Sequence, residues 1–388
     1  MIYVGIDVAK DKHDCFITSS EGEVIKGVFT IPNNIDGFNL LLSFIPDVPK
    51  DKIRVGLEAT GHYSINLIRF ITENQLPLVV LNPLQTNLFR KAQTLRKSKT
   101  DKIDAKLIAI MLHSGNFKLH SDLSYHLQEL KSLTRHKSRI KENLSKYKIS
   151  LNRILDIMFP ELADLVYSLN QKSTYALLQA FPSKNELASA HLTKLTNVLR
   201  QNSRGKYSRE KAILIRKTAA VSIGSDSRAL SFELLQVLSF IETYTYEICK
   251  IDDEIKVIMD DMKSPILSVP GISYGLGSII LAEIGDISRF ESPSKLLAFA
   301  GLEPSTYESG KFIATDMKMV KRGSPYLRWA LLEAARLISV KDPTFRSYYL
   351  KKKAEGKHHF VATSHVAKKL VRVLHHLLTR ELSFIPQG

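Results

Sequence analysis

The chain has 388 residues, of which 44% are hydrophobic and 8% aromatic, a composition typical of a folded protein with two or three domains and unlike that of a disordered chain. It carries 55 Lys and Arg against 39 Asp and Glu, a formal net charge of +16, which favours a polyanionic partner such as nucleic acid. Residues 263–388 alone hold 19 basic and 10 acidic residues, so we expect the strongest contacts with phosphate in that third.

Targeting and cofactor signals are scarce in the sequence. No apolar run approaches the ~20 residues that span a bilayer, and residues 1–10 lack the basic leader and apolar core of a signal peptide. Cys15 and Cys249 are the only cysteines, and they fit neither a zinc site nor a disulfide framework. The P-loop pattern of ATP-driven motors is missing. We therefore expect a cytoplasmic protein with no membrane partner.

The first 115 residues predict an α/β domain. Alternating apolar and polar residues predict strands, and helical spacing or a buried run predicts the elements between them. In chain order we expect strands at 2–10, 12–20 and 23–31, a helix at 36–45, a strand at 53–58, a helix at about 64–74, a strand at 76–82 and, after a basic stretch at 90–99, a helix from about 101. This order is that of a ribonuclease H-like fold.

Four acids in these elements predict a metal site. Asp7 and Glu58 each follow a glycine by two residues on one strand face, and we expect the missing side chain to leave room for a metal and a sugar–phosphate backbone. Asp101 and Asp104 lie three apart at the edge of the last helix's apolar arc. Clustered carboxylates repel unless cations separate them, and two Mg²⁺ ions about 3.5–4 Å apart would clamp a phosphodiester. Taken singly, a strand acid is most often a turn residue and an i,i+3 pair of acids is most often a solvated helix face, whereas four acids in these elements and in this order rarely occur together by chance. The arc comprises Ile103, Leu107, Ile110 and Met111.

The middle of the chain predicts long helices. Apolar residues at 140–158 and 241–262 step alternately by three and four, the spacing of a coiled coil, although a single such helix would fit an ordinary core equally well. Two of them around a basic helical insertion at about 160–230 suggest an antiparallel hairpin or a dimerising coiled coil. The whole architecture is then α/β plus all-α, with an N-terminal catalytic domain at 1–120, a helical coiled-coil region at 121–262 and a mostly helical C-terminal domain at 263–388.

The C-terminal domain opens with "LSVPGISYGLGSIILAEIG", a Pro-Gly turn between apolar segments that is typical of a helix-hairpin-helix. Together with "GIDVAKDKHD", "GLEATGHY", "KTDKIDAKLIA", "AFAGLEPSTYESG" and "KRGSPYLR", it makes the chain resemble the DEDD-type insertion-sequence transposases. The resemblance runs from residue 5 to about 336. It implies a RuvC-like N-terminal domain, a serine-carrying C-terminal transposase domain with a basic tail, and a recombinase that cuts and rejoins DNA.

The resemblance also implies residue roles. The family's metal-binding tetrad falls on Asp7, Glu58, Asp101 and Asp104, and its nucleophilic serine falls on Ser309, with Ser305 as the second choice. Members use Mg²⁺ and a structured guide RNA encoded by the element, which pairs with donor and target DNA, and we expect a homo-oligomer, a dimer or a tetramer. We expect nucleic-acid contacts at Arg96, Lys97, Lys99, Lys102, Lys311, Lys321, Arg322 and Arg328.

Two other functions fit the same residues. A RuvC-like, Mg²⁺-dependent endonuclease of the junction-resolvase type would use the four acids with water as the nucleophile and leave Ser309 idle. A non-catalytic nucleic-acid-binding scaffold would need only the basic surface and the long helices. A covalent protein–DNA adduct separates the recombinase from the nuclease, and strand transfer that depends on Mg²⁺ excludes the scaffold.

Overall fold

The computed structural model of the chain forms two compact units, Met1–Asp122 and Leu123–Gly388, which are described here one at a time. The structure describes residues 1–58, 62–81, 83–93, 101–115, 117, 119–120, 125–303, 308–309, 312–313 and 319–386, with the backbone alone at 84, 93, 101–103, 125, 308–309 and 312–313.

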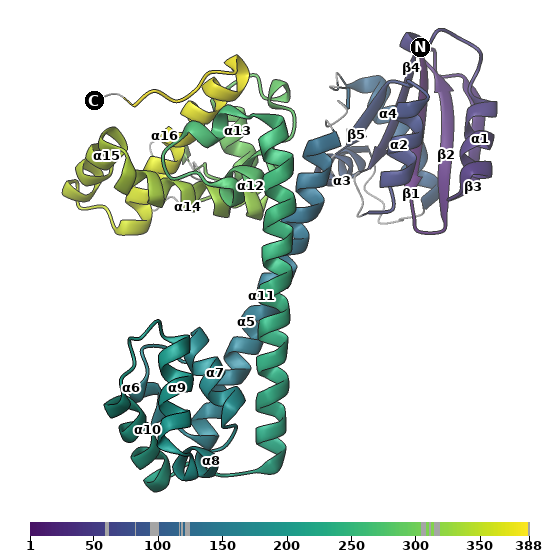
Figure 1. Ribbon diagram of the computed structural model, residues 1–388. Helices are drawn as coiled ribbons and strands as arrows, with labels where there is room; N and C mark the ends of the chain where they lie inside the picture. Colours follow the sequence, from purple (N-terminus) through teal and green to yellow (C-terminus); the bar gives the residue numbers. More distant parts are fainter. Residues whose placement is uncertain are drawn as a thin grey trace. The chain divides into compact units, whose positions relative to one another are not determined.

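A five-stranded sheet forms the centre of the first unit (Figure 1). Its strand order is β3-β2-β1-β4-β5. The first strand runs antiparallel to β2 and parallel to β4, β2 is antiparallel to β3, and β5 is parallel to β4. All five strands were predicted, the last of them from a buried apolar run rather than from alternation. Their bounds are β1 Ile2–Val8, β2 Lys12–Ser19, β3 Val24–Pro32, β4 Ile53–Glu58 and β5 Leu78–Leu81.

Helices cover both faces of this sheet. One face packs on α1 and α2 through residues such as Ile6, Phe38 and Leu67, and the other packs on α4 through Ala105 and Ile108. The bounds are α1 Ile35–Phe44, the 3₁₀ turn η1 Lys50–Lys52, α2 Ile65–Glu73, α3 Pro83–Gln93 and α4 Asp101–Ser114.

Two details of the first unit differ from the sequence prediction. Helix α3 was not predicted, because the basic stretch from Arg90 onward was interpreted as a connection to the last helix. The apolar arc of α4 was also partly wrong. Ile110 is 37% exposed, whereas Ala105, Ile108 and Leu112 are buried against the sheet. The buried face of α4 therefore follows positions 105, 108 and 112, and one turn before Ala105 this line of positions begins at the backbone of Asp101.

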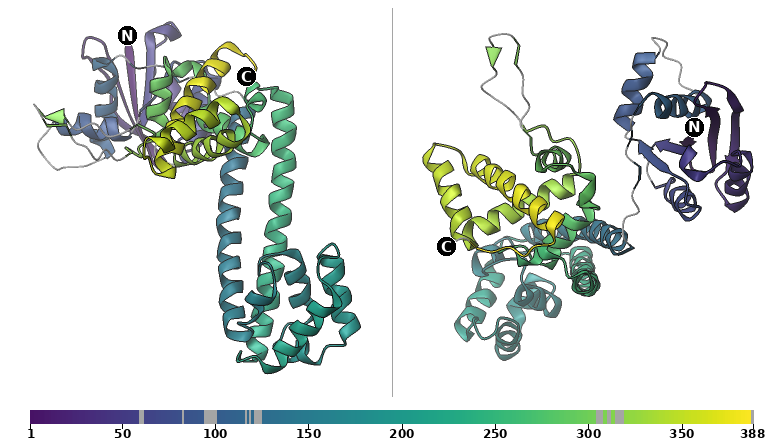
Figure 2. Two further views of the ribbon diagram at one scale, coloured as in Figure 1. Left: turned by 90° about the vertical axis from the view of Figure 1, so that its left-hand side faces the viewer. Right: turned by 90° about the horizontal axis from the view of Figure 1, so that it is seen from above.

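Two long helices organise the second unit. Helix α5 (Tyr125–Met158) and helix α11 (Arg228–Met262) lie side by side over most of their length (Figures 1 and 2). Each end of the pair belongs to a separate apolar core. One core contains Leu151 and Leu238, and the other contains Leu130 and Ile255. Between them Tyr147 stacks on Tyr244 with ring centroids 5.6 Å apart. Whether the pair forms a coiled coil stays a prediction.

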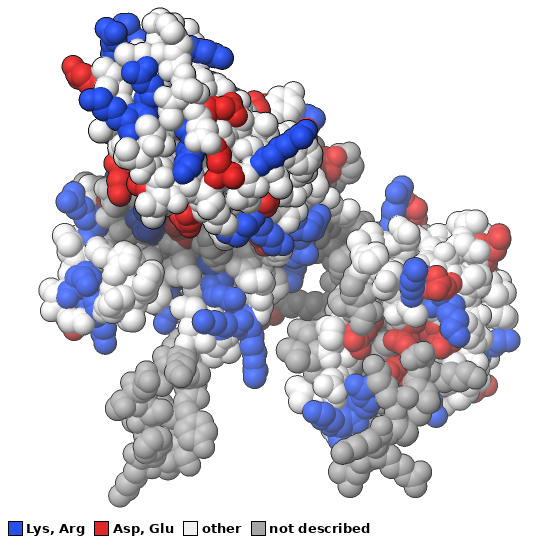
Figure 3. Space-filling model, turned by 90° about the horizontal axis from the view of Figure 1, so that it is seen from below, with Lys and Arg blue, Asp and Glu red and all other residues white. Residues whose placement is uncertain are grey.

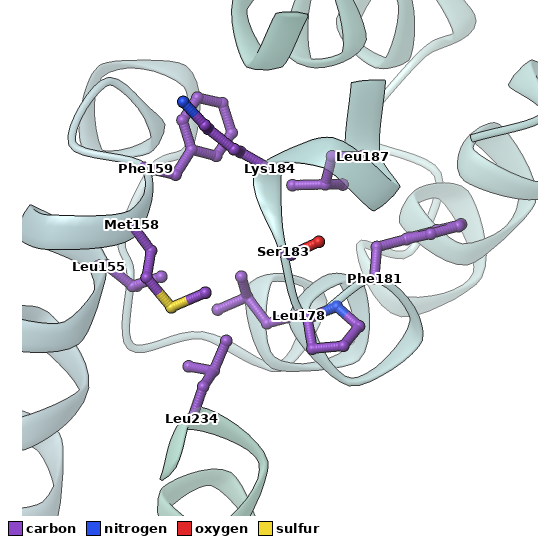
Figure 4. A pocket seen from close by; sticks show the side chains of 10 residues that line it. Leu155, Met158, Phe159, Leu178, Phe181, Ser183, Lys184, Leu187 and Leu234 are labelled. Carbon is purple, nitrogen blue, oxygen red and sulfur yellow. The ribbon is translucent and has the colours of Figure 1, made fainter. Parts of the chain in front are cut away.

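The insertion between α5 and α11 is helical, as predicted. Its helices surround a small apolar pocket of about 200 Å³ that includes space open to solvent (Figure 4). Leu155 and Met158 of α5 and Leu234 of α11 line it together with Phe181. The bounds are α6 Leu162–Leu165, α7 Lys172–Ala180, α8 Lys184–Ser189, α9 Leu192–Asn202 and α10 Arg209–Val221.

The rest of the second unit packs around α16, which buries eight residues and occupies much of the predicted basic tail. The predicted helix-hairpin-helix is only partly present: between α11 and the Pro-Gly turn the chain makes a short 3₁₀ turn, because Pro265 and Pro270 restrict that segment. The bounds are η2 Pro265–Ser268, α12 Tyr274–Ile284, η3 Ile287–Arg289, α13 Pro293–Ala300, β6 Glu308–Ser309, β7 Phe312–Ile313, α14 Pro325–Lys341, α15 Pro343–Ala354 and α16 His359–Arg380.

None of the helices in the described part of the chain has the length and the apolar character needed to cross a membrane.

Candidate functional site

The strand acids lie at one edge of the first unit's sheet. Asp7 is the second-to-last residue of β1, and Glu58 is the last residue of β4. The pairing of Ile6 with Leu57 places the two acids next to each other at the carboxyl ends of adjacent parallel strands. Both are half-buried and share the strand face of the glycines two residues before them.

The glycines have a different purpose from the one predicted. A Cβ atom on Gly5 would lie 2.2 Å from the carbonyl oxygen of Ala105, and a Cβ on Gly56 would lie 2.6 Å from a methyl of Leu112. The space over each glycine is therefore filled by α4, not left for a metal and a sugar–phosphate backbone as predicted. The glycines let α4 approach the sheet closely, and this approach brings Asp104 of α4 to the face of Asp7 and Glu58.

Asp104 lies in the first turn of α4 with its side chain 15% exposed. Arg90 donates from Nη1 to both carboxylate oxygens of Asp104, at 3.3 and 3.4 Å. Asp101 is the first residue of α4, but its side chain lies outside the described residues. The structure thus brings Asp7, Glu58 and Asp104 to one face of the sheet.

A further acid, Asp14, was not predicted as part of the site. Strand register places Asp14 of β2 directly opposite Asp7, and in an antiparallel pair such side chains share a face. Asp14 is 7% exposed, and the hydroxyl of Thr30 donates to its Oδ1 at 2.5 Å. The sequence did contain a signal for this pairing. Asp7 and Asp14 lie on either side of a tight turn at 9–11 that folds β2 back on β1.

The fit to a divalent metal can be tested on this donor set. Carboxylate oxygens on one face suit a hard ion such as Mg²⁺. Among the described side chains, which do not include that of Asp101, no group of three or more His, Cys, Asp or Glu is close enough to hold an ion. The guanidinium of Arg90 already supplies a positive charge at Asp104. The chemistry of the carboxylates and their shared face suit a divalent metal, but the described acids do not approach one another closely enough to hold it by themselves.

The predicted nucleophile lies in the second unit. Ser309 belongs to the short strand β6, which pairs with β7, and only the backbone is described there. The residues on either side of this loop, 301–303 and 319–323, form its stem and make defined contacts. The amide of Val320 donates to the carbonyl of Glu303 at 2.9 Å. Gly301 and Gly323 both have positive φ, +67° and +98°, and a Cβ on Gly323 would lie 1.9 Å from the carbonyl oxygen of Phe299. Both glycines permit turns and backbone contacts that a side chain would block.

A buried ion pair joins three helices near this stem. Glu283 of α12 is 3% exposed and accepts from Arg135 of α5 at 2.8 Å and from the hydroxyl of Ser324 at 2.7 Å. Burial acts to raise the pKa of Glu283, but these two hydrogen bonds together with the positive charges of Arg135 and Lys131 outweigh it and leave the pKa below its ordinary value. Ser324 also caps α14 by accepting from the amide of Leu327. The "KRGSPYLR" stretch therefore has a structural role.

The predicted nucleic-acid contacts are only partly visible. Lys321 and Arg322 are exposed just before α14. Arg328 is half-buried, and its Nη1 atom is buried beside Gly301 without a hydrogen-bond partner among the described residues. Lys102 is described by its backbone alone, and Arg96, Lys97, Lys99 and Lys311 lie outside the described residues. Figure 3 shows Asp and Glu gathered on the first unit with Lys and Arg nearby.

The first unit is an α/β domain with acids at one edge of its sheet, and the second unit is mostly helical and basic, features that suit a protein acting on nucleic acid. Comparison with known proteins makes this specific. A model of DEDD transposases, described as "Transposase", matches residues 4–160, and a model described as "Transposase IS116/IS110/IS902 family" matches residues 263–350. The chain belongs to this family of DEDD-type insertion-sequence transposases, which are enzymes that cut and rejoin DNA.

Three relatives illustrate the match. The chain is 25% identical to the 44.8 kDa protein of insertion element IS116 from Streptomyces clavuligerus, over 99% of this chain and 96% of that protein. It is 23% identical to the pilin gene-inverting protein of Moraxella lacunata, over 98% of this chain and 97% of that one. It is 32% identical to the transposase for insertion sequence element IS1111A of Coxiella burnetii, over 31% and 33% of the two chains.

Proposed function

We propose that the chain recombines DNA through a phosphoserine intermediate on Ser309, with a divalent-metal site formed by Asp7, Glu58, Asp101 and Asp104. Membership of the DEDD transposase family supports a dependence on a divalent metal. The observation that carries the proposal is the shared face of the three described acids, which come from two strands and one helix and would otherwise repel one another.

The chemistry needs little more than these residues. The Oγ atom of Ser309 forms a bond to phosphorus while the bond from phosphorus to the leaving strand breaks, and the serine proton ends on the oxygen of that strand. The ester keeps the bond energy, so the second strand can be joined by the reverse step without ATP. A bound Mg²⁺ pair would stabilise the charge that develops on the phosphate oxygens. In this proposal the first unit is a RuvC-like domain and the protein acts as a homo-oligomer.

The partners are donor and target DNA, and we propose that a structured RNA from the same element guides their choice. The relatives support the DNA part, since one is a transposase and another inverts a pilin gene. The excess of 19 basic over 10 acidic residues in 263–388 supports contacts with phosphate backbones. The RNA part rests on the resemblance to guided members of the family.

Trapping the intermediate tests the proposal. Labelled target DNA with a nick beside the cleavage site is incubated with protein and Mg²⁺, then resolved by denaturing electrophoresis and peptide mapping. Wild-type protein and Ser305→Ala should form a covalent adduct, and Ser309→Ala should form none while still binding DNA. An adduct that maps to Ser305 would overturn the choice of residue. Cleavage without any adduct would favour the water-using nuclease.

A further inference from the structure

Helix α3 presents polar side chains to the candidate metal site from a single turn. Thr86, Asn87 and Arg90 lie at positions i, i+1 and i+4, and two of them contact acids of the proposed tetrad. The acids belong to different elements, Glu58 to β4 and Asp104 to α4. One helix turn therefore connects the strand part and the helix part of the site.

The contact between Thr86 and Glu58 is short, and Thr86 is buried from solvent. Thr86 is 5% exposed, and its hydroxyl donates to Oε2 of Glu58 at 2.6 Å. The hydroxyl oxygen of Thr86 also lies 3.1 Å from the carbonyl oxygen of Pro83, which is a longer contact to a neutral acceptor. A hydroxyl has one proton, and a charged acceptor at the shorter distance is the stronger competitor for it. Thr86 thus fixes the direction of the Glu58 carboxylate.

The contact with Asp104 is looser and more open. One guanidinium nitrogen of Arg90 faces both Asp104 oxygens, at 3.3 and 3.4 Å, and the other donates to Oδ1 of Asn87 at 3.1 Å. The side chains of Arg90 and Asp104 are 26% and 15% exposed. Asn87 therefore orients the guanidinium, while both oxygens that Asp104 could offer a metal ion face the positive charge of Arg90.

We propose that α3 controls metal loading, with Thr86 as a positioning residue for Glu58 and Arg90 as an internal cation that competes with the metal for Asp104. This rests on the proposed metal site. Without metal, Arg90 offsets repulsion among the carboxylates. A divalent ion at Asp104 meets this positive charge, so Arg90 has to move off the carboxylate as the ion binds. The two contacts act in opposite directions: Thr86 favours metal binding and Arg90 opposes it.

Substitutions of Arg90 and Thr86 should change metal affinity in opposite directions, so the proposal can be tested without measuring catalysis. Mn²⁺ binding to the full chain in the absence of DNA is measured by the EPR signal of the free ion. Arg90→Ala should bind Mn²⁺ about tenfold more tightly than wild type, and Thr86→Val about tenfold more weakly, the lower end of the scale for groups that support metal ligands. Thr86→Ser keeps the hydroxyl and should restore wild-type affinity, which loss of packing alone would not explain.

The matched control is Arg69→Ala. It removes an exposed arginine from α2 whose pair with Glu73 lies away from the tetrad, and it should leave Mn²⁺ affinity unchanged. If Arg90→Ala does not fold, as judged by circular dichroism, Arg90→Gln removes the charge and keeps a polar side chain. The proposal would be overturned if the Arg90 variant bound Mn²⁺ no more tightly than Arg69→Ala does. It would also be overturned if Thr86→Val bound Mn²⁺ as tightly as the wild type.

One further variant separates this proposal from the proposed function. Asp7→Asn should abolish Mn²⁺ binding if the acids form the metal site. Binding that is lost in Asp7→Asn but equal in wild type and Arg90→Ala would overturn the role of α3 alone. A wild-type protein that binds no Mn²⁺, or an Asp7→Asn variant that binds it normally, would overturn the metal site and the role of α3 together.

Discussion

Two of the ion pairs that join an arginine to an acid differ in length and in the burial of the acid. In the second unit, Arg135 meets Glu283 at 2.8 Å, the carboxylate is 3% exposed, and Ser324 donates to its other oxygen. In the first unit, Arg90 meets Asp104 at 3.3 Å, and the Asp104 side chain is 15% exposed. The arginine is partly exposed in both pairs, so the difference lies in the acid: a short contact to a fully buried carboxylate is more costly to break than a longer contact to a partly exposed one.

This difference helps to separate acids that stabilise the fold from acids that are expected to take part in the reaction. Glu283 joins α5, α12 and the start of α14, so its partners are fixed by the fold. Asp104 lies on a face that it shares with Asp7 and Glu58, and its side chain is 15% exposed. We therefore expect changes at the first acid to alter stability and changes at the second to alter activity.

The largest effect should follow neutralisation of the tetrad. Asp7→Asn, Glu58→Gln, Asp101→Asn and Asp104→Asn should each abolish metal-dependent cleavage of supercoiled donor DNA. The melting temperature should stay the same or rise, because one repelling charge is removed. Glu73→Gln, on the exposed face of α2, serves as the control for cleavage. Full activity in two of the four variants would show that these acids are not the metal site.

Glu283→Gln should have the opposite profile. Removing the charge leaves Arg135 and Ser324 with a neutral acceptor, and because Arg135 is 42% exposed the cost should be that of weakened charged hydrogen bonds, about 1.5 kcal/mol of unfolding free energy. Denaturant unfolding measures this directly. Metal affinity of the variant should match that of the wild type. A variant as stable as wild type would show that this pair contributes little to holding α12 and α14.

The same pair predicts a dependence on pH. The pKa of Glu283 is lower in the folded protein than in the unfolded chain, so its stabilisation is complete above the unfolded value, about 4.3, and is lost as the pH falls through the folded value. The stability difference between wild type and Glu283→Gln should therefore shrink below about pH 4. A difference that stays constant from neutral pH to pH 3 would contradict the ionised state of this side chain.

Asp14 should give a smaller effect that sharpens the comparison within the site. Asp14→Asn keeps the shape and the bond from Thr30 and removes the charge opposite Asp7. We expect cleavage to fall about tenfold, as for groups that support metal ligands, without a loss of stability. Single-turnover cleavage over a range of Mg²⁺ concentrations measures it. A rate equal to that of wild type would leave Asp14 with no part in the site.

The smallest effect should come from the exposed basic pair before α14. Lys321→Glu and Arg322→Glu should each weaken DNA binding and lower the slope of log K against log salt by about 1, since each contact releases about one counterion. Lys194→Glu, in the insertion, is the control. Binding isotherms at several salt concentrations give the slopes. Unchanged slopes in both variants would place the DNA elsewhere.

The sequence predicted most of the first unit because alternation and helical spacing are local signals. Strand bounds came within a few residues, and the acids were assigned to the correct elements. Helix α3 was missed because its apolar signal is weak: Leu88 is 66% exposed, and its last turn is basic. The contacts of Thr86 and Arg90 could not be predicted, since they depend on how that helix packs.

The role of the glycines shows a second limit. A sequence reveals that Gly5 and Gly56 lack a side chain, but not which atoms fill the space, and here the backbone of α4 and Leu112 fill it. Asp14 was overlooked for a similar reason, because only the strand register places it opposite Asp7. The assignment of Ser309 came from the resemblance alone and stays a prediction.

The closed stem of the Ser309 loop has a consequence for how this region can change in length. The bond between Val320 and Glu303, together with the turns at Gly301 and Gly323, brings the ends of the segment together. The entropy cost of a longer loop then grows only slowly, by about 0.6 kcal/mol for each doubling. We therefore expect insertions or deletions between Glu303 and Val320 to leave the packing of α13 and α14 unchanged, so that the length of the segment that carries the proposed nucleophile can vary separately from the stability of the fold.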